Sequence, residues 1–83
     1  MYIHLGSDVV ITAQNLIAIV NIEEPLSADL QDILDVAAEE RKLINISAKD
    51  KKKALVICDD YAYISPISSV TLYKRANNFY KEV

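Results

Sequence analysis

The strongest constraint on the fold is a change from strand-like to helical hydrophobic spacing, which occurs twice along the chain. After Ser27, a favourable N-cap residue, apolar side chains recur at three- and four-residue intervals. This apolar stripe consists of Leu30, Ile33, Leu34 and Ala37. Acidic residues fill the first half of the segment and Arg41 and Lys42 follow at its end, as the helix dipole favours. We therefore expect an amphipathic helix with a solvated charged face.

Strand-like patterns occupy most of the remaining sequence. Residues 2–5 alternate between apolar and polar, and the turn residues 6–8 lead into a second run, which together predict a hairpin. Residues 16–22 are continuously apolar up to Val20 and rich in β-branched side chains, which is typical of a strand covered on both faces. Thr12 is placed to cap a short turn before that run. Further strands are expected at residues 43–47, 54–58 and 61–65, the last two joined by a tight turn at Asp59 and Asp60.

The second helical segment follows Pro66. Ser68 is placed to cap it, and Leu72, Ala76 and Phe79 recur at helical spacing. The predicted element order is therefore βββαβββα. We expect one small α+β domain over residues 1–83, with mostly antiparallel strands and two helices.

Composition adds an expectation about assembly. Of the 83 residues, 52% are apolar, and only one is glycine. A domain this short buries only about 60–65% of its surface, so it has more apolar surface than one small core hides. Symmetric homo-oligomers are the usual way to cover such surface, and we expect one here.

The sequence offers little from which to build a catalytic site. The chain has one histidine, one cysteine and one glycine, which are His4, Cys58 and Gly6. These residues are too few to build a zinc site, a Ser-His-Asp triad or a phosphate-binding glycine loop. We expect no enzyme, metal, cofactor or small-molecule substrate. Cys58 lies in an apolar run and is expected to be a buried strand residue. Without a secretory signal or a membrane-length apolar run, the protein is expected to be cytoplasmic, with no membrane partner.

Two basic clusters are the candidate binding residues on a chain whose net charge is −3. The first, the lysine loop, contains Lys49, Lys51, Lys52 and Lys53, and the second consists of Lys74 and Arg75 in the second helix. The lysines are suited to phosphate contacts, although such loops are also common as solvated turns. The hydroxyls of Ser68, Ser69 and Thr71 could bind an anion, but capping their own helix is the commoner use.

Several segments together resemble the RemA/RemB family of bacterial regulators of extracellular matrix and biofilm genes. They are "MYIHLG", "QNLIAIV", "AAEERKLINIS", "ALVICDD" and "SPISSVTLYKRA", and the first and last are most similar to the RemB branch. The resemblance implies a DNA-binding transcriptional regulator that assembles into a ring-like homo-oligomer. It implies contacts with promoter DNA, expected to be AT-rich, through basic residues of several subunits.

Two departures from that family pattern keep a second hypothesis open. RemA-type proteins have Asn-Arg where this chain has Gln14 and Asn15, and the family's loop arginines align with Asp50 and Lys51. Lysine keeps the charge of arginine but not its bidentate geometry. The alternative is an oligomeric protein-interaction or scaffold module that does not itself bind DNA.

Overall fold

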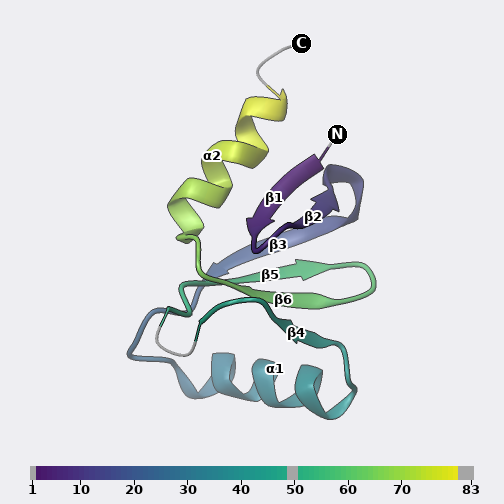
Figure 1. Cartoon of the computed structure of the whole chain (residues 1–83). Helices are drawn as coiled ribbons and strands as arrows, with labels where there is room; N and C mark the ends of the chain where they lie inside the picture. The colour runs from purple at the N-terminus through teal and green to yellow at the C-terminus, as the bar shows by residue number, and fades with distance from the viewer. Residues whose placement is uncertain (1, 49–50, 81–83) are drawn as a thin grey trace.

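The computed structural model describes residues 2–48 and 51–80, and its elements follow the order that the sequence predicts. The strands are β1 (Tyr2–Gly6), β2 (Val9–Thr12), β3 (Leu16–Asn21), β4 (Leu43–Asn45), β5 (Ala54–Cys58) and β6 (Ala62–Ser65), and the α-helices are α1 (Ala28–Glu39) and α2 (Ser69–Tyr80). A short 3-10 helix spans Ala13–Asn15. The chain forms the expected small α+β domain (Figure 1).

The strands form two sheets. β1 and β2 make an antiparallel hairpin, and the other four strands are arranged in the order β3-β5-β6-β4. Pairing in the larger sheet is antiparallel except between β4 and β6, which run parallel. Gly6 ends β1 with a φ of 107°, and a Cβ atom there would lie 3.2 Å from Cγ of Pro66. The hairpin therefore requires the single glycine of the chain at this position.

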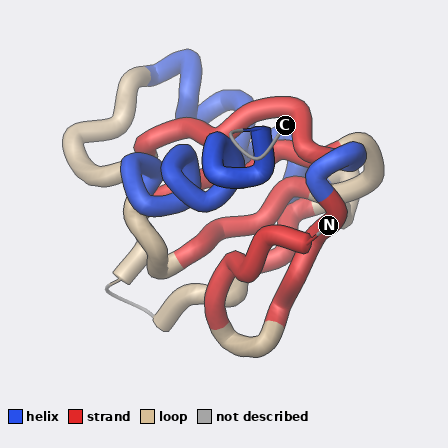
Figure 2. Tube along the Cα trace, turned by 90° about the horizontal axis from the view of Figure 1, so that it is seen from above, coloured by secondary structure: helices blue, strands red, loops and turns tan. Residues whose placement is uncertain are grey.

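The larger sheet is the middle of three layers (Figure 1). On one side α1 packs over a core of Ile22, Leu34, Leu55, Ala62 and Ile64. On the other side α2 and the β1–β2 hairpin enclose a larger core that includes Ile3, Leu5, Ile11, Ile19, Val56 and Leu72. Seen from above, the helix that leads to the C-terminus lies across the strands (Figure 2). Of the residues that recur at helical spacing in α2, Leu72 and Ala76 are buried, and the side chain of Phe79 lies outside the described residues.

Several apolar residues that were expected in a core are exposed instead. β3 was predicted to be covered on both faces, but it is an edge strand, and a pairing irregularity beside Ile17 leaves that side chain exposed. Ile33 of the predicted α1 stripe is half exposed, because Leu30 and Leu34 take the places closest to the sheet. Thr12 precedes the 3-10 helix but its side chain makes no capping hydrogen bond.

Candidate nucleic-acid interface

The described part of the lysine loop lies where β5 begins. The side chains of Lys51, Lys52 and Lys53 are all exposed. The backbone N–H of Lys53 donates to the carbonyl oxygen of Ser65 (3.0 Å), and its carbonyl oxygen accepts from the N–H of Ile22 (3.1 Å). The loop is thus fixed at one end to both β6 and the end of β3, while its ammonium groups face solvent. Lys49, which the sequence also selects, lies outside the described residues.

A broad hollow of about 880 Å³ separates the lysine loop from α1. Its rim includes Lys51, Lys52 and Lys53 on one side and Glu23, Glu24 and Asp35 among the other lining residues. Among the described residues, the ion pair present is Lys42 with Glu40, so these three lysines have no carboxylate partner within that part of the chain. The ammonium groups remain available to a ligand, beside carboxylates that lower the local positive potential.

The second basic cluster lies farther along α2. Ser65 connects the lysine loop to the segment that begins this helix, so the loop and the helix start lie at the same end of the sheet (Figure 1). Lys74 is exposed there, whereas Nη1 of Arg75 donates to the carbonyl oxygen of His4 (2.7 Å). This hydrogen bond joins Arg75 to β1 and occupies one of its donors.

The hydroxyl-rich start of α2 caps the helix. Oγ of Ser68 accepts from the N–H of Thr71 (3.2 Å) and donates to the hydroxyl of Thr71 (3.0 Å). Oγ of Ser65, which is fully buried, accepts from the N–H of Ile67 (3.0 Å) and donates to the carbonyl oxygen of Leu5 (2.7 Å). These hydroxyls serve the helix and its junction with the hairpin, which confirms the capping interpretation.

The opposite end of the sheet is acidic. The β5–β6 turn contains Asp59 and Asp60, and the N–H of Asp59 donates to the carbonyl oxygen of Asn15 (3.0 Å). At position 15, where the family resemblance implies an arginine, this chain has the neutral residue Asn15, and its backbone is hydrogen-bonded to that of the acidic residue Asp59. Position 15 therefore does not supply positive charge at this end of the molecule, where the basic residues are Arg41 and Lys42 after α1.

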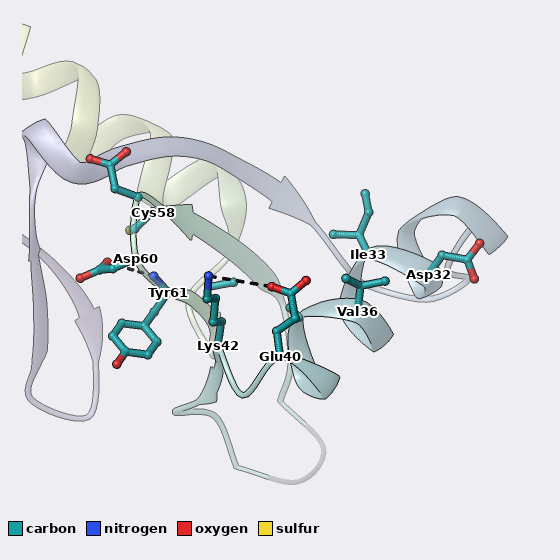
Figure 3. A pocket seen from close by; sticks show the side chains of 11 residues that line it. Asp32, Ile33, Val36, Glu40, Lys42, Cys58, Asp60 and Tyr61 are labelled. Carbon is teal, nitrogen blue, oxygen red and sulfur yellow. Dashed lines mark hydrogen bonds and ion pairs between the residues drawn. The ribbon is translucent and has the colours of Figure 1, made fainter.

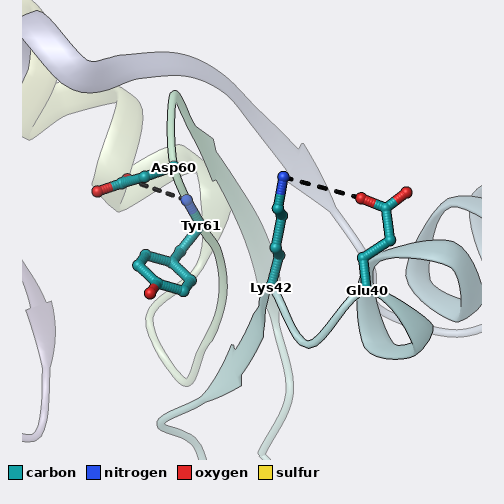
Figure 4. A network of polar contacts seen from close by, with 4 residues as sticks. All are labelled: Glu40, Lys42, Asp60 and Tyr61. Atoms are coloured by element: carbon teal, nitrogen blue, oxygen red, sulfur yellow. Dashed lines mark hydrogen bonds and ion pairs between the residues drawn. The ribbon is translucent and has the colours of Figure 1, made fainter.

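A second hollow, of about 430 Å³, lies at this acidic end and was not predicted from the sequence. It is lined by Ile33, Val36 and Ala37 of α1 and by residues of the β5–β6 turn (Figure 3). At its edge Nζ of Lys42 lies 3.9 Å from Oε2 of Glu40, and Oδ1 of Asp60 accepts from the N–H of Tyr61 (Figure 4). We call it the α1 groove. The two parts of its lining, α1 and the β5–β6 turn, are distant in sequence. The sequence could therefore have suggested the groove only through the apolar residues of α1 other than Leu30 and Leu34, which pack on the sheet.

Cys58 also lines the α1 groove, and its thiol is not a reactive group. Burial, together with the nearby carboxylates of Asp60 and Asp59, raises the pKa of this thiol from 9.0 to about 11. The thiolate is the nucleophilic form, so Cys58 stays protonated and inert at neutral pH.

No described residues form a cluster of three or more His, Cys, Asp or Glu side chains that could hold a metal ion. Neither helix in the described ranges has the length and apolar composition needed to cross a membrane.

Comparisons with known proteins identify the class. The model of the RemA-like family, extracellular matrix regulatory protein A-like, matches residues 2–76. The chain therefore belongs to the RemA-like family.

Among individual relatives, the extracellular matrix regulatory protein B of Bacillus subtilis (strain 168) is 32% identical over 76 residues, which cover 92% of this chain and 90% of the relative. Two proteins of Bacillus cereus, from strains AH187 and Q1, are each 30% identical over 78 residues, or 93% of this chain and 86% of each relative, and both are described as regulatory proteins. The resemblance to the RemB branch seen in the sequence is thereby confirmed.

Proposed function

We propose that this protein is a DNA-binding transcriptional regulator of extracellular matrix genes that acts as a ring-like homo-oligomer. The observation that carries the proposal is the lysine loop, where Lys51, Lys52 and Lys53 are consecutive, exposed and unpaired among the described residues. Membership of a regulatory family gives this basic surface its context.

Assembly explains how a chain of net charge −3 could bind DNA. Three lysines in one subunit provide only a few phosphate contacts. In a ring, the same loop recurs at fixed spacing, and binding of one loop raises the effective concentration of the next. Lysines contact phosphates as point charges, so we expect recognition through the DNA backbone and shape more than through base edges.

The proposal is tested by fluorescence anisotropy of a labelled AT-rich promoter duplex over a salt series. If three phosphates are neutralised by one loop, the affinity falls about 40-fold between about 50 and 200 mM salt, and more if several subunits bind. A variant with Lys51, Lys52 and Lys53 all changed to Glu should lose binding. The matched variant with all three changed to Arg keeps the charge and should bind at least as well as the wild type.

A second control separates the lysine loop from positive charge in general. Lys42 is exposed on a different part of the surface, and Lys42→Glu should leave DNA binding nearly unchanged. Lys74→Glu tests whether α2 extends the DNA contact. If the triple Glu variant binds as the wild type does, the lysine loop is not the DNA surface.

The alternative function, a protein-interaction or scaffold module, is favoured by the acidic end of the sheet. Asn15 stands where the family has an arginine, and it adjoins Asp59. A folded oligomer that shows no salt-sensitive binding to DNA at low salt, yet binds a protein partner saturably, would support this alternative and exclude the proposal above.

A further inference from the structure

The α1 groove is an apolar surface with an acidic rim. Ile33 is half exposed, Val36 is 52% exposed and Tyr61 is 42% exposed, although all three are large and hydrophobic. In the close-up, Ile33 and Val36 project from α1 on the side that faces the β5–β6 turn (Figure 3). Among the lining residues, four carboxylates stand against the single ammonium group of Lys42. Such a surface fits an apolar partner that carries positive charge.

The chain presents a surface of that kind on its opposite layer. Val70 of α2 is 62% exposed and Tyr73 is 49% exposed, and with Lys74 they lie at the spacing that puts residues on one helix face. The hydroxyl of Tyr73 donates to the carbonyl oxygen of Ile19 (2.7 Å), which holds the ring in place against β3. We call Val70, Tyr73 and Lys74 the α2 face.

The two helices have opposite charge. The acidic residues of α1 are Asp29, Asp32, Asp35 and Glu39, and the helix contains no Lys or Arg. α2 contains Lys74 and Arg75 but no Asp or Glu. Because like charges repel across an interface, two α1 grooves do not suit each other, and neither do two α2 faces. The favourable combination is one groove with one α2 face.

We infer that the α2 face of one subunit docks in the α1 groove of the next. Val70 and Tyr73 then cover Ile33 and Val36, and Lys74 lies near the carboxylates of the rim. This inference rests on the homo-oligomer of the proposed function and names its contact. Since α1 and α2 lie on opposite sides of the sheet, the contact is head-to-tail, and such a contact forms a ring when the rotation from one subunit to the next closes. In this arrangement Lys74 contacts the neighbouring subunit, and the lysine loop remains exposed to contact DNA.

Three single substitutions test the contact by sedimentation velocity. Val36→Glu places a carboxylate in the groove, and Val70→Glu places one on the α2 face. Val10→Glu is the matched control, because Val10 is as exposed as Val36 but lies on the hairpin, outside both surfaces. A carboxylate buried without a partner is costly, so each of the first two should raise the concentration needed for assembly by about 30-fold or more, and the control should not.

Mixing the two variants gives the decisive result. Val36→Glu retains an intact α2 face, and Val70→Glu retains an intact groove, so an equimolar mixture can form one good contact and no more. We expect each variant alone to be monomeric and the mixture to contain a dimer. Circular dichroism of each variant, together with the dimer itself, shows that loss of assembly is not loss of folding.

Every outcome bears on the inference. Assembly by either variant as strongly as by the wild type, or a mixture without dimer, overturns it, and so does a wild-type monomer. If the wild type assembles and the variants do too, the oligomer stands and only this contact is wrong. A wild-type oligomer that does not bind DNA would contradict the DNA part of the proposed function and leave the contact in place. A groove that binds a basic peptide but no second copy would also contradict the inference.

Discussion

The two faces of the four-stranded sheet are covered to different degrees. On one face α2 and the β1–β2 hairpin bury Leu72 completely and Ala76 almost completely. On the other, α1 has a single buried residue, Leu34, and leaves Ile33 and Val36 in the α1 groove. Both helices are amphipathic and equally long. The difference shows that amphipathic spacing alone does not decide how much of a helix is buried, because one helix faces the sheet together with a hairpin and the other faces it alone.

The largest expected effect compares the two cores directly. Leu72→Ala removes a side chain with no exposed surface, and Leu34→Ala removes one that is 8% exposed beside a groove. We expect losses of about 4 kcal/mol and about 2 kcal/mol in the free energy of unfolding, because the open site can collapse or admit water. Urea denaturation of both variants at one protein concentration measures the difference. Equal losses would show that the α1 layer is packed as tightly as the α2 layer.

Ser65 tests the polar junction on the better-covered face. Its buried hydroxyl joins the carbonyl of Leu5 to the N–H of Ile67, so Ser65→Ala leaves both groups without this partner. We expect a loss of about 2–3 kcal/mol in the free energy of unfolding. Ser7→Ala is the control, since Oγ of Ser7 donates to the carbonyl of Ile46 at an exposed site, and it should cost only about 0.5 kcal/mol. A similar small cost for both would mean that water replaces the hydroxyl of Ser65.

The buried thiol of Cys58 makes the free energy of unfolding depend on pH in alkaline solution. The thiol has a pKa of about 11 in the folded protein, against 9.0 as its ordinary value, so the folded state keeps its proton while the unfolded state loses it. The stabilisation is therefore complete below about pH 9 and is lost as the pH rises toward 11, by roughly 2 kcal/mol. Urea denaturation at several pH values should show this decline in the wild type.

Cys58→Ala isolates the contribution of the thiol. Burial also raises the pKa of Tyr63, so both proteins should lose some stability in alkaline solution. The wild type should lose more than the variant between about pH 9 and 11. Parallel curves for the two proteins would contradict the assignment of the effect to Cys58.

Most of the fold could be predicted because its signals are local. Ser27 and Ser68 mark the starts of the helices, and the polar residues 6–8 and 59–60 mark the two tight turns, where neighbouring residues decide the conformation. The parallel pairing of β4 with β6 and the exposure of Ile17 and Ile33 could not be predicted. They depend on which strands lie at an edge and which helix residues reach the sheet, and sequence spacing contains neither.

The candidate site also has a part that the sequence predicts and a part that depends on tertiary packing. Consecutive charges identify Lys51, Lys52 and Lys53 without any structure, because no packing is needed to place a run of lysines on a surface. The hydrogen bond from Arg75 to His4 joins residues at opposite ends of the chain, and the α1 groove unites Val36 with the β5–β6 turn. Such contacts are set by tertiary packing, so the sequence supplies the charge of a surface but not its neighbours.

Helix capping is where the two faces should differ least. Oγ of Ser27 accepts from the N–H of Leu30 at 3.1 Å, and Oγ of Ser68 accepts from the N–H of Thr71 at 3.2 Å. Ser27→Ala and Ser68→Ala should therefore each lower the free energy of unfolding by about 1 kcal/mol, since each removes one capping bond at the first turn. Urea denaturation of the two variants should give nearly equal midpoints. Equality would mean that the contrast between the faces comes from packing, whereas a much larger loss for Ser68→Ala would mean that the junction between α2 and the hairpin depends on its hydroxyl as well.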